Sequence, residues 1–233
     1  MWRSNLFILS TALFLLLLGV KRPALAGSCP PTTCTVHVTA TVGDHTVDLP
    51  VSQDDQGNLH VDSSPLRAVP SDALPNSTAP TTSSARLTIE IQIVIVVSNN
   101  ANIPQVYSFP FNFDFSGFDF ESLGGFFLTT ASTSYILVDT HGNGVRVAPM
   151  DRQSKVVNWQ SFFPSRDLKV DTGKDCSAGN GTPAAQFSCG PFSAASLFKA
   201  RNLSNSVLAS TVTFALSPQD EAGIDTHLIL ILP

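Results

Sequence analysis

The stretch from Leu87 to Val97, which reads LTIEIQIVIVV, constrains the fold of this chain more than any other stretch. Every second residue is apolar, and most of these are β-branched, a period of two that predicts a β-strand. The intervening positions begin polar and become apolar at Val94 and Val96. We therefore expect a central strand that is half-solvated where it begins and buried on both faces where it ends.

The first 26 residues have the features of a signal peptide. Arg3 precedes an apolar run over residues 6–20, and a small-residue A-x-A pattern ends at Ala26. The run is shorter than the roughly 20 apolar residues that a spanning helix needs. We predict cleavage after Ala26 and no membrane span in the mature chain. The basic residues Lys21 and Arg22 leave an uncleaved anchor as the alternative.

Residues 27–233 are expected to form a single all-β domain, an antiparallel β-sandwich or a jelly-roll-like fold. Short alternating segments recur between turn residues, and at most one short helix is predicted, at Phe192–Asn202, which has a proline near its start and basic residues in its last turn. The Pro-, Ser- and Thr-rich stretch over residues 63–85 is too poor in apolar residues to hold a core. It is either a surface loop of the domain or a linker.

A two-residue turn at Gly43-Asp44 separates two alternating segments. A Gly-x turn of this kind is typical of a type II′ β-hairpin. Its phase would place Val42 opposite His45 and Ala40 opposite Val47. Further strands are predicted at residues 59–62, 132–139, 144–148, 154–160, 168–171, 207–216 and 226–232, with a loop over residues 172–190.

The charge balance argues against nucleic acid as a partner. Removal of residues 1–26 would take away three of the 13 Lys and Arg residues and no acidic residue, leaving 10 basic against 18 acidic residues. Such a chain lacks the basic patch that displaces counterions from phosphates. Charged residues make up 13% of the chain, about half of the usual fraction in soluble domains. This composition favours an extracellular β-protein, whose partner would be an unknown extracellular protein or surface.

All four cysteines, Cys29, Cys34, Cys176 and Cys189, follow the predicted cleavage site. An even count in an exported protein indicates two disulfides. Short loops favour the pairs Cys29–Cys34 and Cys176–Cys189. The alternative is a long-range bridge from the N-terminus to the late loop. No C-x-x-C motif gives these cysteines the spacing of a metal site.

Phenylalanine is concentrated between residues 109 and 127, where the sequence begins FPFNFDFSGFDFE. The phase changes at Ser116-Gly117, which predicts either a hairpin that pairs Phe113 with Phe120 or one strand with a bulge at Gly117. The first interpretation of these side chains is an aromatic core. The alternative is a binding site for an apolar ligand. The candidate residues for this site are Phe109, Phe111, Phe113, Phe115, Phe118 and Phe120.

The other face of that hairpin would carry acidic side chains. The pairing brings Asp114 close to Asp119, with Glu121 nearby. Like charges opposite each other repel, so a bound cation would stabilise them, and oxygen ligands suit calcium. These three residues are therefore candidate calcium ligands, with a solvated acidic face as the alternative. Asp139 with Asn143 is a second candidate.

The chain contains none of the short motifs that carry catalysis, such as G-x-S-x-G, H-E-x-x-H or a P-loop. We expect no enzyme activity and no cofactor other than the candidate calcium ion. The first functional interpretation is a secreted or cell-surface domain, periplasmic in a bacterium, with a structural, adhesive or matrix role. The alternatives are an apolar-ligand module that uses the hairpin of residues 109–127 and a secreted hydrolase of unrecognised type. In a eukaryotic host, Asn76 and Asn202 are candidate glycosylation sites.

Overall fold

The computed structural model describes residue 29 and residues 33–68, 87–114, 127–149, 157–161, 168–170, 174–195 and 207–232. The predicted signal peptide, most of the 63–85 stretch and both candidate glycosylation sites lie outside these residues. Within them, we find no helix with the length and apolar character needed to cross a membrane.

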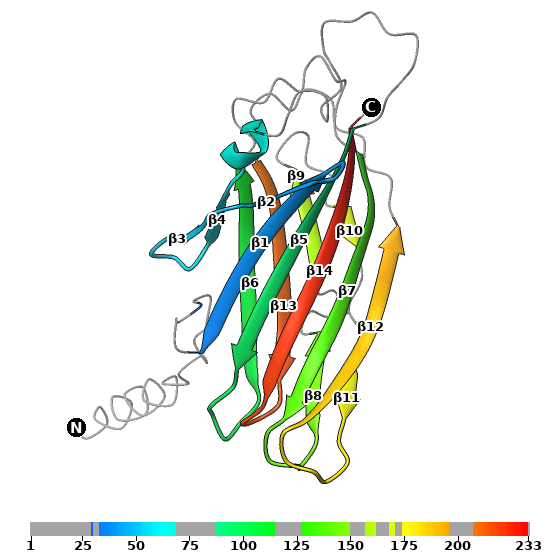
Figure 1. Ribbon diagram of the computed structural model, residues 1–233. Coiled ribbons are helices and arrows are strands. Elements are labelled where there is room, and N and C mark those ends of the chain that lie inside the picture. Colours follow the sequence, from blue (N-terminus) through cyan, green and yellow to red (C-terminus); the bar gives the residue numbers. More distant parts are fainter. Residues whose placement is uncertain are drawn as a thin grey trace, which may run out of the picture.

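Two β-sheets stacked face to face make up the described chain, which is an all-β sandwich (Figure 1). The first sheet has six strands, in the spatial order β12 (Ala185–Ala195), β7 (Phe127–Asp139), β14 (Glu221–Leu232), β5 (Leu87–Ser98), β1 (Cys34–Val42) and β2 (His45–Asp48). The second has eight strands, with the row β10 (Leu168–Val170), β9 (Val157–Ser161), β13 (Val207–Leu216), β6 (Gln105–Asp114), β4 (Leu59–Asp62) and β3 (Val51–Gln53). Its last two strands are β8 (Val145–Pro149), which also pairs with β13, and β11 (Cys176–Ala178), which pairs with β8.

All described strand pairs are antiparallel except β4 with β6, which run parallel. A short 3-10 helix, η1 (Ser64–Ala68), follows β4 and buries Leu66. The strands predicted at residues 59–62 and 207–216 form as β4 and β13. The sequence pattern therefore located most strands, while their order in the two sheets depends on pairings between distant segments.

The stretch from Leu87 to Val97 belongs to β5, which lies between β1 and β14 and pairs with both along its length. The prediction of a central strand is confirmed. Its odd-numbered residues from Ile89 onward point inward and are at most 3% exposed. The predicted burial of its second face is wrong, because Val94 is only partly buried and 44% of Val96 is exposed.

That second face is part of what we call the outer face, the side of β1, β5, β14 and β7 that points away from the second sheet. No described element covers it (Figure 1). Apolar residues such as Val94 on it pack only against their neighbours within the sheet. The alternation of β5 therefore continues to its end, with one face in the core and one toward solvent.

The predicted hairpin at Gly43 is confirmed. Val42 pairs with His45 and Ala40 with Val47, as the phase of the two segments requires. Gly43 has a φ of +61°, the conformation that the first central position of a type II′ turn needs and that glycine adopts without steric cost. The turn thereby sets the register that points the apolar residues of β1 into the core.

The chain crosses between the sheets on one side of the sandwich, and a disulfide joins them on the opposite side. After β2 the chain passes through Leu49 and Pro50 into the second sheet, where Asp62 donates its N–H to the carbonyl of Pro50 (2.9 Å). On the opposite side, Cys176 of β11 is bonded to Cys189 of β12. Because β11 and β12 belong to different sheets, this bond joins the two sheets covalently.

Both short-range disulfides predicted from the sequence are present, and the alternative long-range bridge is wrong. The Cys29–Cys34 bond ties the segment before β1 to the first residue of that strand. Disulfides form and persist in oxidising compartments. The two bonds therefore indicate an oxidising environment for the folded protein.

The predicted helix at Phe192–Asn202 is wrong where the structure describes it. Its first four residues, Phe192–Ala195, form the end of β12 and pair with β7, and the others lie outside the described chain. The predicted loop over residues 172–190 likewise contains β11 and the beginning of β12. A ladder along a long neighbouring strand outweighs the weak helical preference of alanine-containing segments.

The Phe-rich segment is an interior strand where the structure describes it. Phe113 pairs with Leu208 of β13 on one side and with Val61 of β4 on the other. Both edges of β6 are occupied, so the predicted hairpin pairing of Phe113 with Phe120 is wrong. The residues after Asp114 up to residue 126 lie outside the described chain.

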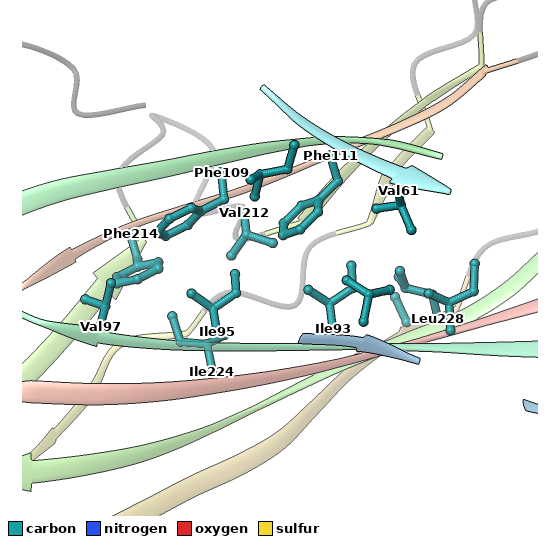
Figure 2. Packing of buried hydrophobic residues seen from close by; sticks show 14 of the residues in the cluster. Val61, Ile93, Ile95, Val97, Phe109, Phe111, Val212, Phe214, Ile224 and Leu228 are labelled. Atoms are coloured by element: carbon teal, nitrogen blue, oxygen red, sulfur yellow. The ribbon is translucent and has the colours of Figure 1, made fainter. Parts of the chain in front are cut away.

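The core lies between the two sheets. Figure 2 shows side chains of β5 and β14, among them Ile95 and Leu228, facing side chains of β6 and β13, among them Phe111 and Val212. These four side chains are at most 1% exposed. Burying one large apolar side chain contributes about 1.5–3 kcal/mol, so this layer is the main source of stability.

Candidate functional site

Three of the six candidate ligand-binding phenylalanines lie in β6 and point into the core. Phe109, Phe111 and Phe113 are at most 1% exposed. The ring of Phe109 lies 6.0 Å from that of Phe214 in β13, a core contact between aromatic side chains. These three side chains therefore offer no surface to a ligand. Outside the described residues lie the other three candidates, Phe115, Phe118 and Phe120.

The strand pairing on which the first calcium candidate depends is not formed. Asp114 pairs with Val207 of β13 on one side and with Asp62 of β4 on the other. With both edges of β6 occupied, a hairpin that places Asp114 opposite Asp119 cannot form. Asp119 and Glu121 themselves lie outside the described residues.

Asp139 is the buried centre of the turn between β7 and β8. It is 0% exposed and accepts hydrogen bonds from the N–H of Asn143 to Oδ1 (3.0 Å) and from the N–H of Gly144 to Oδ2 (2.8 Å). Successive N–H groups around a carboxylate form an anion-binding arrangement, here filled by the protein's own side chain. Asn143 thus meets the Asp139 carboxylate through its backbone N–H, and the carboxylate that was a candidate calcium ligand is buried inside the turn.

Replacing Asp139 with Ala is expected to lower the free energy of unfolding by about 2 kcal/mol, since two N–H groups lose their shared acceptor. Urea unfolding measures this loss. The matched control is Asp55→Ala, which removes an exposed carboxylate from another turn and should cost less than about 0.5 kcal/mol. Equal losses in the two variants would show that the Asp139 carboxylate does not organise its turn.

Two glycine-rich turns pack against each other at the same end of the sandwich. They are residues 141–144, between β7 and β8, and residues 179–182, between β11 and β12. A Cβ at Gly179 would lie 2.8 Å from the Cα of Gly144, closer than a real Cβ contact. The two turns therefore approach each other at a distance that only glycine permits.

A shallow cleft of about 500 Å³ opens between these turns. Asn143, Ser177 and Asn180 line it with amide and hydroxyl groups, and Arg146 is its only charged lining residue. Arg146 is ion-paired with Asp175, so its charge is balanced at the rim. The cleft is therefore a surface of mixed polar and apolar character, and its one charged lining residue is balanced by an ion pair.

Gly179→Ala is expected to lower the free energy of unfolding by about 1–3 kcal/mol, because the added methyl group overlaps the backbone of Gly144. Gly223→Ala in β14 is the matched control. A Cβ at Gly223 would meet its nearest neighbour, the Cβ of Ile136, at 3.7 Å, an ordinary contact. The control should leave stability unchanged or raise it by up to about 1 kcal/mol. Thermal unfolding of both variants measures these changes in stability. A Gly179 variant as stable as the Gly223 variant would contradict the close packing of the two turns.

A smaller depression of about 190 Å³ brings His141 together with Asp220 and Glu221. A histidine and carboxylates in one depression are what the hydrolase alternative requires. Asp220, however, is 1% exposed and accepts hydrogen bonds from the Ser217 hydroxyl (2.5 Å) and the Thr140 N–H (3.2 Å). In the described part of the chain His141 makes no hydrogen bond to either carboxylate. Asp220 is thus held by its own turn and by Thr140, while Glu221 accepts a hydrogen bond from the Ser98 hydroxyl (3.2 Å).

Three titratable side chains meet on the outer face, across β5 and β14. Nδ1 of His227 lies 2.7 Å from Oε1 of Glu90, and Nε2 lies 3.2 Å from Oδ1 of Asp225. Gln92 donates from Nε2 to the same Asp225 oxygen (3.0 Å). Both ring nitrogens thus face carboxylate oxygens, an arrangement that suits the protonated imidazole, in which both nitrogens donate.

The surroundings of His227 act on its protonation in two directions. Burial lowers the pKa of His227, while the hydrogen bonds to Glu90 and Asp225 and the charges of both carboxylates raise it. The net effect is a pKa above the usual value for histidine. The two nitrogens point to different carboxylates, so the groups do not converge as metal ligands do. Among the described residues no three His, Cys, Asp or Glu side chains are placed to hold a metal ion.

Sequence analysis did not single out Glu90, His227 or Asp225. The one available signal was Glu90, the only acidic residue within the apolar alternation of β5. Residues 90 and 227 are far apart in the chain, and their contact depends on the register between β5 and β14. No local pattern contains that register.

Comparison with known proteins identifies no relative. No protein family matches the chain, and no curated protein matches it. The cryo-EM structure of Broad Bean Stain Virus is 12% identical, with a TM-score of 0.17 over 86% of this chain and 79% of that chain. The crystal structure of the infectious bursal disease virus VP2 subviral particle is 10% identical, with a TM-score of 0.12 over 88% of this chain and 58% of that chain. Likenesses at these TM-scores carry no argument about this protein.

Proposed function

We propose that this protein is an exported domain, secreted or held at the cell surface, with a non-catalytic structural, adhesive or matrix role. The observation that carries the proposal is the use of the Phe-rich strand, whose described phenylalanines fill the core instead of lining a groove. The signal-peptide pattern of residues 1–26 supports export. Two disulfides, one of them between the sheets, support a working environment outside the reducing cytosol.

Under this proposal residues 27–233 form one sandwich domain that meets other extracellular proteins or surfaces through exposed parts of its sheets and turns. The cleft between the glycine-rich turns is one such part, since binding residues concentrate on turns held by a rigid scaffold. The outer face is another. On it, Val96 and Ile136 are 44% and 45% exposed on either side of Gly223.

Expression of the full chain with a C-terminal tag in a secretory host tests export. We expect the protein outside the cytosol, with Gly27 as its N-terminal residue by mass spectrometry. All four cysteines should resist alkylation until the protein is reduced. Retention in the cytosol with four alkylatable thiols would contradict the proposal.

A fluorescent apolar dye such as Nile red separates this proposal from the apolar-ligand alternative. We expect no saturable rise in fluorescence with the folded, oxidised protein, because the described phenylalanines are buried. A saturable rise that disappears when Phe118 and Phe120 are replaced would favour the apolar-ligand module instead.

A further inference from the structure

The contacts of His227 differ from those of the other paired histidines in the described chain. His37, His45 and His60 each lie 3.0–3.3 Å from one carboxylate oxygen, at Asp48, Asp44 and Asp54. His227 contacts two carboxylates, one on its own strand and one on β5. Its side chain is 35% exposed, against 44–56% for the other three. It is therefore the histidine whose charge is most strongly tied to the fold.

We propose that Glu90, His227 and Asp225 form a proton-responsive clamp on the outer face. The clamp is closed in mildly acidic surroundings, where both ring nitrogens bond to carboxylates. It is released at alkaline pH, where one of these bonds is lost. When the imidazole is protonated, each ring nitrogen donates to a carboxylate and the three groups carry one net negative charge. When the imidazole loses this proton, one of its ring nitrogens no longer carries a hydrogen. That nitrogen can then no longer donate to the carboxylate that it faces. The net charge of the three groups then becomes minus two.

No other charged group on the neighbouring strands offsets this change. On β5 the register partner of His227 is Gln92, and on β7 it is Ser132. Two residues along β7 lies Ser134, opposite Asp225. On β1, beyond β5, His37 lies opposite Val94 and is paired with Asp48. The charge state of the clamp therefore depends on His227 alone.

The sign of the pH dependence follows from the direction of the pKa. A histidine whose pKa is raised in the folded state stabilises that state fully below its unfolded pKa of about 6.5. The contribution is lost as pH rises through the higher folded pKa. The clamp thus makes the folded protein more stable at pH 6 than at pH 8.5, and makes its outer face less acidic at the lower pH.

Proton NMR of the histidine rings and thermal unfolding test the clamp, using oxidised protein expressed from the full chain. We expect the ring of His227 to titrate above the ordinary histidine value of about 6.5, and Glu90→Gln to lower that midpoint. We also expect the loss of Tm between pH 6 and pH 8.5 to be smaller in His227→Gln than in the wild type. The matched control, His37→Gln, should keep the wild-type loss.

Two results would overturn the proposal. One is a titration midpoint of His227 at or below the ordinary histidine value of about 6.5. The other is the same pH dependence of Tm in the wild type and in His227→Gln. The ring titration is measured on the wild-type protein, so a His227 variant that fails to fold leaves the test intact. The proposed function does not enter this test, and a failure of export or adhesion would leave its outcome unchanged.

Discussion

Replacing Phe111 with Ala is expected to lower the free energy of unfolding by about 3–5 kcal/mol and Tm by roughly 6–20 °C. Phe111 is 0% exposed, and its ring centre lies 6.3 Å from that of Phe113 in the same strand. Removing the ring would leave a cavity between the sheets, because neighbouring strands on both sides hold β6 in place. The lost transfer free energy and the cavity add together. Urea unfolding followed by circular dichroism measures the change.

Ile103→Ala is the matched control for Phe111→Ala. Ile103 lies in the turn before β6 and is 62% exposed, so its truncation should change stability by less than about 0.5 kcal/mol. If the Phe111 variant were as stable as the Ile103 variant, the Phe-rich strand would not be part of the core. The apolar-ligand interpretation of its side chains would then return.

Removing the Cys176–Cys189 bond is the second large effect we expect. The double variant Cys176→Ala/Cys189→Ala should lose about 3 kcal/mol, because a bond across 13 residues restricts the unfolded chain. The bond also joins β11 of one sheet to β12 of the other, in addition to the turn that connects these two strands. Thermal unfolding of the oxidised variant and wild type measures the loss.

The other disulfide provides the control. Cys29 and Cys34 are five residues apart, so Cys29→Ala/Cys34→Ala should lose about 2 kcal/mol in the same chain-entropy treatment. The ranking of the two double variants by their loss of stability is the sharper test. A larger loss from the N-terminal bond contradicts the expected ranking, and no loss on full reduction of the wild type contradicts a stabilising role for the bond between the sheets.

Much of the secondary structure could be predicted because strand periodicity is local. The alternation in Leu87–Val97 predicted β5, and the phase across Gly43 predicted both the turn and the register of β1 with β2. The spacing of the cysteines favoured the two bonds that form. In each case the residues that interact are close in sequence, so the pattern itself contains the geometry.

The errors share a cause, which is that a pattern does not identify distant partners. Phe192–Ala195 resembles the start of a helix, yet β7 is available as a neighbour and the segment becomes strand. Phe113 looks ready to pair with Phe120, yet β4 and β13 take both of its edges. Those partners come from parts of the chain that no short window includes.

For the candidate sites, too, the sequence determined some features and the tertiary structure decided the others. The sequence by itself determined an acidic β-protein made of alternating strands, with four cysteines spaced for two short-range disulfides. Only the tertiary structure decided that Asp139 is buried beneath its own turn and that Val96 faces outward. It also brought His227 between Glu90 and Asp225. The reason is physical: period two fixes which residues share a face of a strand, whereas the register and stacking of the sheets decide what each face meets.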